Sequence, residues 1–369
     1  MFQKTPVLAI SALLGFALAH PGHDPTEEMM ERRDFIKALG RSDLSHCAEK
    51  LESRGVVARN AARRAAAVDK ARKKRGLGKR NLQDLLNTDH DRSDLGYTPE
   101  TDINTLFTSD SSCLLTPEVT EGPYYVGGEF IRSDVTDGED GVPLILDYQV
   151  IDVNTCDPIP NIHLELWHCN ATGVYSGVVV QGNGNAADET NLDNTFGRGI
   201  QETDADGVAQ FETIFPGHYT GRTIHNHLLV HTNAQPFPNG TLGNEVSASH
   251  IGQAYFDQDL INEVERNQVY LQNQQPLTQN ANDFILAQQA NTEGVDPFHE
   301  YVLLGDSVSE GLFAWLAFGI SPSSSRVIQP AVNYYEEGGV KNPNAGSGFP
   351  GFPPGGWPKR EAEKQEEKK

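Results

Sequence analysis

Two histidines, an arginine and a tyrosine fall within nine residues of one another in the segment that runs from Phe215 to His227. Because side chains alternate between the two faces of an extended strand, His225 and His227 project to the same side. The proline and glycines that surround Tyr219 indicate a loop that returns its side chain towards that face. The spacing predicts a site in which two imidazoles and one phenol approach a single metal ion.

A second tyrosine, Tyr175, lies on an earlier turn-rich segment and completes a set of four candidate metal ligands. Phenolate is a hard anionic donor, which suits a trivalent ion such as Fe(III) better than Zn²⁺ or Cu⁺. Two phenolates and two neutral imidazoles leave one positive charge on Fe(III), which favours an anionic oxygen substrate. Taken alone, Tyr175 is equally well explained as a core aromatic, and a lone histidine pair is more often structural than ligating.

Two other patterns suggest metal chemistry and are less favoured. His20 would be the mature N-terminus, as in a copper-binding histidine brace, but termini are ordinarily flexible. The run from Asp204 to Gly207 can begin a calcium loop, yet the glutamate required further along is missing. We expect a hairpin turn there instead. His168 and His218 flank the candidate ligands and are interpreted as structural, or as supports of the site.

The N-terminus has the pattern of a secretory signal at residues 1–19. Lys4 supplies the charge, residues 7–18 are apolar, and Ala17-Leu18-Ala19 forms a cleavage site. The apolar run is too short for the roughly 20 residues that a spanning helix needs. We therefore expect a secreted, extracellular protein without a membrane segment.

Export makes the cysteines candidates for disulfide bonds. Four cysteines allow two disulfides in three possible pairings, and the sequence does not choose among them: Cys47, Cys113, Cys156 and Cys169. The sequons at Asn170 and Asn239 fit a secreted glycoprotein.

The net charge of −22 hides an asymmetry along the chain. Residues 1–80 hold 17 Lys and Arg against 9 Asp and Glu, whereas residues 81–369 hold 12 against 42. The acidic body should repel nucleic acid and anionic surfaces. We interpret the basic stretch at 54–80 as a solvated helix or a pro-region, and Lys79-Arg80 as a possible processing site.

The chain divides into a helical basic region with a linker (20–95), a body (96–332) and a disordered tail (333–369) rich in Gly, Pro and charge. The whole chain holds 35 Gly and 21 Pro, and the body is expected to consist of short strands joined by turns. A short helix is expected at 261–269 and irregular structure at 181–200. The expected strands are 144–153, 162–167, 199–202, 208–214, 225–232, 251–256, 301–304 and 311–319.

Four segments, in order, resemble motifs of the intradiol ring-cleavage dioxygenases. They are an opening segment at 115–124, the first metal-tyrosine motif at 164–177, the second tyrosine with Arg-x-x-His-x-His at 216–227, and a glutamine segment at 252–257. Within the second segment, the sequence Trp-His-Cys-Asn-Ala-Thr-Gly is similar to that of the secreted fungal members. The resemblance covers about residues 113–320.

The resemblance implies an all-β sandwich core that holds one non-haem Fe(III). Tyr175 and His225 would be equatorial ligands, and Tyr219 and His227 axial ones. A catechol would bind as a dianion and displace Tyr219, which helps to take up a proton. Reaction with O₂ would open the ring between its hydroxyls to a cis,cis-muconate-type diacid.

The resemblance also assigns two further catalytic side chains. Arg222 would stabilise negative charge on the substrate, and Gln253 would orient it. The specific catechol stays open. The oligomeric state stays open as well, a homodimer included, because the basic helical region does not match the dimerisation helices of bacterial members.

Two alternatives compete with this interpretation. A cupin-type Fe(II) or Mn(II) oxygenase would also use a His-x-His pair, but residues 228–236 lack the acid that such a site needs. A non-catalytic β-sandwich that binds metal or aromatics would use the tyrosines for packing. Colour separates these possibilities, because ferric tyrosinate absorbs visible light and the alternatives should be nearly colourless.

Overall fold

The computed structural model describes residues 44–77 and 122–343, apart from 181, 186, 233, 235, 243–246, 249 and 291–295. It also describes residues 30, 33–34, 37 and 112–114. The expected signal peptide, His20, the Lys79-Arg80 pair and residues 344–369 lie outside these ranges, as does the linker up to residue 111. Within the described residues, no helix combines the length and the apolar character needed to cross a bilayer.

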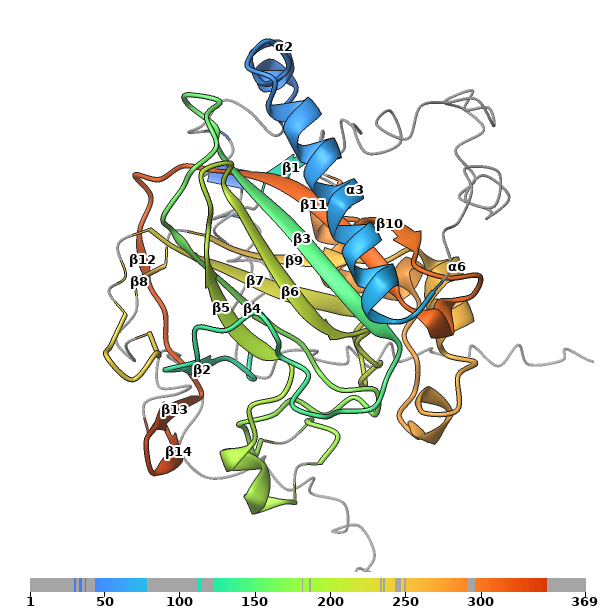
Figure 1. Cartoon of the computed structure of the whole chain (residues 1–369). Coiled ribbons are helices and arrows are strands. Elements are labelled where there is room, and N and C mark those ends of the chain that lie inside the picture. Colours follow the sequence, from blue (N-terminus) through green and yellow to red (C-terminus); the bar gives the residue numbers. More distant parts are fainter. Residues whose placement is uncertain are drawn as a thin grey trace, which may run out of the picture.

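Two β-sheets that pack against each other form the body (Figure 1). The first sheet has the order β1 (Ser112–Leu114), β11 (Leu312–Ile320), β3 (Pro143–Asp152) and β6 (Val208–Ile214), and β10 (Glu300–Leu303) also pairs with β11. The second has the order β5 (Arg198–Glu202), β4 (His163–Trp167), β7 (His225–His231) and β9 (His250–Tyr255). The expected all-β sandwich is confirmed.

Strand alternation decides which side chains enter the core between the sheets. Leu164 and Leu166 of β4 pack there with Leu228 and Val230 of β7, against residues of the first sheet such as Leu146. Their neighbours in sequence therefore point to the outer face of the second sheet. That outer face carries the histidine pair of β7.

Loops and small sheets cover this outer face. A second apolar cluster includes aromatic side chains from three covering segments: Tyr124, Tyr125, Tyr175 and Tyr219. The minor strands are β2 (Val126–Gly127), β13 (Val332–Tyr335) and β14 (Gly338–Lys341) in one sheet, and β8 (Ser247–Ala248) with β12 (Arg326–Val327) in another. Short helices complete the described chain: η3 (Glu189–Asp193), α6 (Gln258–Val264), η4 (Tyr270–Gln272), η5 (Asn280–Asn282), α7 (Phe284–Ala290) and η6 (Val308–Glu310).

The basic N-terminal region is helical and lies across the first sheet (Figure 1). It consists of η1 (Ser45–Cys47), α2 (Ala48–Ser53) and α3 (Val56–Lys74). Ala61 and Val68 pack against Phe313 and Trp315, and Arg64 is buried beside Asp147. The expectation of a solvated helix is therefore wrong, because α3 neutralises acidic groups of the body and covers an apolar surface.

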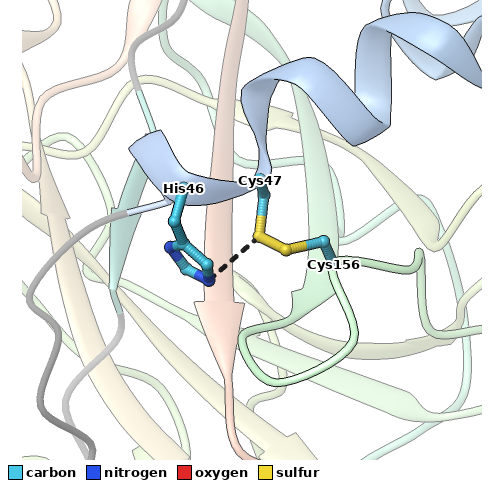
Figure 2. Close-up of side chains that lie close together, drawn as sticks. All are labelled: His46, Cys47 and Cys156. Carbon is cyan, nitrogen blue, oxygen red and sulfur yellow. Dashed lines mark hydrogen bonds between the residues drawn. A yellow bond between two sulfur atoms is a disulfide. The ribbon is translucent and has the colours of Figure 1, made fainter.

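One disulfide joins these helices to the sandwich (Figure 2). Cys47 bonds to Cys156, in the turn after β3, and His46 contacts the Cys47 sulfur. This trio has the spacing of a metal site, but disulfide sulfurs are not thiolate ligands. Cys169 is a buried free thiol that donates to the carbonyl of Gly217, so the expected second disulfide is wrong.

Three local expectations also need correction. The tail does not begin at residue 333, since β13 and β14 form a hairpin up to Lys341. The turn from Asp204 to Gly207 does not join a hairpin, because β5 and β6 belong to different sheets. The Asp204 carboxylate accepts hydrogen bonds from the backbone N–H groups of Asp206 and Val208. These bonds give Asp204 a structural role in the turn that needs no calcium ion. The helix expected at 261–269 lies earlier, as α6.

Candidate functional site

The four candidate ligands come together in one buried cluster on the outer face of the second sheet. The Nε2 atoms of His225 and His227 are 3.1 Å apart, and the Tyr219 hydroxyl lies 3.4 Å from His225 Nε2. The Tyr175 ring is 5.3 Å from that of Tyr219 and 6.1 Å from that of His227, centroid to centroid. Residues from a strand and from two separate loops thus meet as the sequence predicts.

The strand β7 orients the two imidazoles. His225 Nδ1 lies 2.7 Å from the carbonyl oxygen of Thr223 and donates to it, which leaves the lone pair of Nε2 facing the cluster. Burial, with the nearby Arg222 charge, lowers the pKa of His225 to about 3, so the ring is neutral at physiological pH. Trp167 lies opposite His227 in the β4–β7 register and stacks on its ring at 4.6 Å.

Two loops bring the tyrosines to the histidines, and they pack backbone against backbone. A Cβ atom on Gly173 would lie 2.1 Å from the carbonyl oxygen of His218, beside Tyr219. A Cβ atom on Gly217 would lie 2.3 Å from the carbonyl oxygen of Ala171 in the Tyr175 loop. Glycine at both positions therefore allows the close approach that sets the distance between the phenols.

Burial raises the pKa of both phenols above the ordinary value for tyrosine. The Tyr175 side chain is fully buried, and its hydroxyl lies close enough to Tyr219 to act on the pKa of that phenol, without a full hydrogen bond among the described residues. A buried hydroxyl without a full hydrogen bond is costly, and a ligand bound beside it would offset that cost. The interpretation of Tyr175 as an ordinary core aromatic does not explain that geometry.

The donor set fits a metal ion. Two nitrogens bound at about 2.1 Å and at a right angle to each other would be about 3.0 Å apart, close to the separation of the two Nε2 atoms. Two phenol oxygens beside neutral imidazoles form a hard, mixed N/O set that suits Fe(III). Tyr175, Tyr219, His225 and His227 are thus the residues that would hold the ion.

Arg222 is fully buried beside this cluster and belongs to a polar network that includes Asp283. Its Nε donates to Asp283 at 2.9 Å, and its Nη2 donates to Gln253 and to the Tyr255 hydroxyl. Although burial alone would raise the pKa of Asp283, the Arg222 guanidinium holds it below the ordinary value. Gln253 lies opposite His227 in the β7–β9 register. Arg222 and Gln253 therefore both lie next to the four candidate ligands.

Four other histidines of the body have partners away from this cluster. These contacts are His168 Nε2 with Thr213, His218 Nδ1 with Glu265, His231 Nε2 with Glu165, and His250 Nε2 with the N–H of Ser321. The structural interpretation of His168 and His218 agrees with these contacts.

Sequence reasoning missed several residues that support the site. Asp283 pairs with Arg222 across 61 residues, and the Tyr124 ring stacks on the Tyr175 ring at 4.5 Å. Tyr124 was visible only as part of the opening segment, and no local pattern indicates Asp283. Asn183 lies in the segment expected to be irregular, where its role is not apparent from sequence.

Comparisons with known proteins bear on the same part of the chain. A family model described as Dioxygenase matches residues 120–275, a stretch that contains the four candidate ligands with Arg222 and Gln253. Catechol 1,2-dioxygenase 1 of Acinetobacter lwoffii is 33% identical over 109 residues, which are 28% of this chain and 32% of that protein. A catechol 1,2-dioxygenase of Pseudomonas sp. (strain EST1001) is 42% identical over 66 residues, 16% of this chain and 22% of that protein. The matches therefore span about a third or less of these relatives.

Among solved structures, an intradiol ring-cleavage dioxygenase from Tetranychus urticae is 30% identical to this chain. The match covers 57% of this chain and 96% of the other, with a TM-score of 0.46.

Proposed function

Because the chain belongs to the intradiol ring-cleavage dioxygenase family, we propose that it uses Fe(III) and O₂ to cleave a catechol-type ring between its two hydroxyls. The observation that carries this proposal is the convergence of two phenols and two imidazoles, with the His225 and His227 Nε2 atoms 3.1 Å apart. The product would be a cis,cis-muconate-type diacid.

In this proposal the metal ion would activate the substrate, and the protein would hold the ion in place. Bound Fe(III) would act as a Lewis acid that draws electron density from the catechol oxygens and activates the ring towards O₂. The buried Tyr175 hydroxyl, which makes no full hydrogen bond among the described residues, would stay as a ligand throughout. The neutral His225 ring would present Nε2, because its Nδ1–H is occupied by the Thr223 carbonyl.

Tyr219 would serve as both ligand and proton acceptor. Burial favours its neutral phenol, since the pKa is raised above its ordinary value. Once its oxygen is released from the ion, it would therefore take a proton from an incoming catechol hydroxyl. The proton would stay on Tyr219 Oη while the substrate is bound as an anion.

Arg222 would stabilise the negative charge that develops on the substrate. Its guanidinium is fully buried, and water therefore screens its field little. Gln253 shares a hydrogen bond with Arg222 and lies next to His227, so it would orient the substrate beside the histidine pair.

The setting of this reaction would be extracellular. The signal-like pattern of residues 1–19 supports secretion, as does the Cys47–Cys156 disulfide, because disulfides persist in oxidising compartments. N-terminal sequencing of protein recovered from culture medium would test this location, and retention of the intact N-terminus inside the cell would contradict it.

Visible absorption of the iron-loaded protein tests the proposed function. We expect a tyrosinate-to-iron charge-transfer band, uptake of O₂ with catechol, and a ring-opened diacid product. Tyr175→Phe and Tyr219→Phe should each alter the band and lower turnover by at least about tenfold. Tyr335→Phe, at a half-exposed position on β13, is the matched control and should change neither. Iron-replete protein without a visible band would refute the proposal.

A further inference from the structure

The backbone of Tyr175 is held by the side chains of two asparagines. Its N–H donates to Asn183 Oδ1 at 2.8 Å, and its carbonyl accepts from Asn183 Nδ2 at 2.9 Å and from Asn191 Nδ2 at 2.8 Å. Both amides also reach the carbonyl of Val178, and both side chains are buried. Two side chains thus replace the ladder bonds that a strand would have provided.

Arg198 holds the residue that follows Tyr175. Its Nε donates to the Ser176 carbonyl at 3.0 Å, and its Nη2 donates to the same carbonyl at 2.8 Å and to the Tyr124 carbonyl at 2.6 Å. The guanidinium is only 1% exposed. Since the Tyr124 ring stacks on the Tyr175 ring, Arg198 fixes both the backbone of the loop and the ring that lies on it.

The four candidate ligands differ in how much support their elements give them. His225 and His227 lie on β7, whose register with β4 and β9 fixes their positions. Tyr175 lies on a loop, and a loop is less accurate as a support than a strand. The side-chain N–H groups of Asn183 and Asn191 both donate to carbonyls of this one loop, those of Tyr175 and Val178.

We propose that Asn183 and Asn191, together with Arg198, position Tyr175 before any metal binds, so that its phenol already faces the histidine pair. These are positioning residues, because they act on the backbone of Tyr175 and do not touch the ion or the substrate. The inference rests on the proposed function for the identity of the metal. The arrangement of the loop itself is testable without metal.

The first measurement uses metal-free protein. Hydrogen–deuterium exchange should show a protected Tyr175 amide in the wild type and exchange that is about tenfold faster in Asn183→Leu, which removes the acceptor of its N–H. Asn185→Ala is the matched control, because Asn185 lies in the same segment but bonds to Asp188. Exchange at Tyr175 that is equally fast in wild type and Asn183→Leu would overturn the proposal.

The second measurement follows iron. Asn183→Leu and Asn191→Leu should lose iron to a chelator about 10- to 100-fold faster than the wild type, with a weakened charge-transfer band. On a Tyr175→Phe background, Asn183→Leu should accelerate iron loss no further, since its effect passes through Tyr175. Additive effects of the two substitutions would contradict a positioning role.

A milder variant covers the case in which Asn183→Leu does not fold. Asn183→Asp keeps the acceptor for the Tyr175 N–H and loses the donor to the Tyr175 carbonyl. It should keep the amide protected and still release iron faster than the wild type. Unchanged iron release in this variant and in Asn191→Leu would overturn the proposal. A wild type without a visible band would refute the proposed function alone, since amide exchange in metal-free protein still decides whether the loop is held.

Discussion

At the scale of single residues, the buried charge of Arg222 depends on one carboxylate. Asp283 accepts from Arg222 Nε and from the backbone N–H groups of Thr223 and Leu286. Asp283→Asn would remove the carboxylate charge that pairs with the buried guanidinium, which should lower the free energy of unfolding by about 3 kcal/mol. The misplaced Arg222 should also lower kcat/KM for catechol by at least about tenfold. Urea unfolding and steady-state kinetics measure the two effects, and a variant with wild-type values would contradict this role.

Glu129 gives the protein a predictable pH dependence. Burial raises the pKa of this carboxyl from 4.5 to about 7, even though Arg198 lies 3.7 Å away and favours the charged form. The folded state therefore keeps a proton that the unfolded chain releases, so stability falls as pH rises from about 4.5 to about 7. A difference of this size corresponds to roughly 3 kcal/mol.

Glu129→Gln removes this titration and should flatten the dependence of the melting temperature on pH over that interval. Exposed Glu189→Gln, whose partner is Lys341 on the surface, is the control and should follow the wild type. If the melting temperatures of the wild type and Glu129→Gln changed with pH in parallel, folding would not raise the pKa of Glu129, and this prediction would be wrong.

The candidate ligands were predictable because their geometry is local. Strand alternation fixes His225 and His227 relative to each other, and the adjacent turn returns Tyr219 to them. Asp283 and Asn183 were not predictable, since each contact depends on how a loop folds back over the sheet. No short spacing encodes that arrangement.

At the scale of elements, helix α3 is attached to the first sheet by buried polar contacts. Asp147 is fully buried and accepts from Arg63 and Arg64 of the helix, and Asn60 donates to Gln149 at 2.6 Å. Asp147→Ala should lower the free energy of unfolding by about 3 to 5 kcal/mol, because it removes the buried carboxylate that Arg63 and Arg64 share.

A surface pair provides the comparison for α3. Arg59 and Asp206 also join the helix to the body, at 2.8 Å, but Arg59 is half exposed. Arg59→Ala should lower the urea midpoint much less than Asp147→Ala does, because water screens the exposed pair. Equal losses for the buried and the exposed pair would refute the difference that we assign to burial.

The strands were predicted better than their pairing. Apolar alternation located β3, β4, β6 and β7 to within one or two residues, since burial of one face imposes the period of two. The turn after Asp204 has the same sequence features whether it closes a hairpin or leads from one sheet to the other. Likewise, charge counts revealed that α3 is basic but not which acids it would meet.

At the scale of the whole molecule, the opposite charges of the two chain regions meet inside the protein. The basic helix faces Asp147, Asp206 and Glu212 of the acidic body, and so the asymmetry of the sequence serves folding. The disulfide strengthens this attachment, because it closes a loop of 109 residues. A loop near 100 residues contributes about 4.7 kcal/mol in the chain-entropy model. The pairing of Cys47 with Cys156 was unpredictable, since it depends on where α2 meets the turn after β3.

The sequence predicts that a secretory protease cuts after Lys79-Arg80, at residues outside the described part of the chain. The attachment of α3 and the disulfide decide whether the two resulting pieces separate. The N-terminal piece would contain Cys47 and α3, and the remainder would contain Cys156 and the catalytic site. The two pieces should therefore stay together as one disulfide-linked molecule, with α3 still docked on the first sheet.

Secreted protein should migrate as one band without reductant and as two bands with it. Cys47→Ser is the control and should yield two bands in both denaturing gels. A cut protein that yields two bands without reductant would contradict the tether, and secreted protein that begins only at His20 would contradict the cleavage.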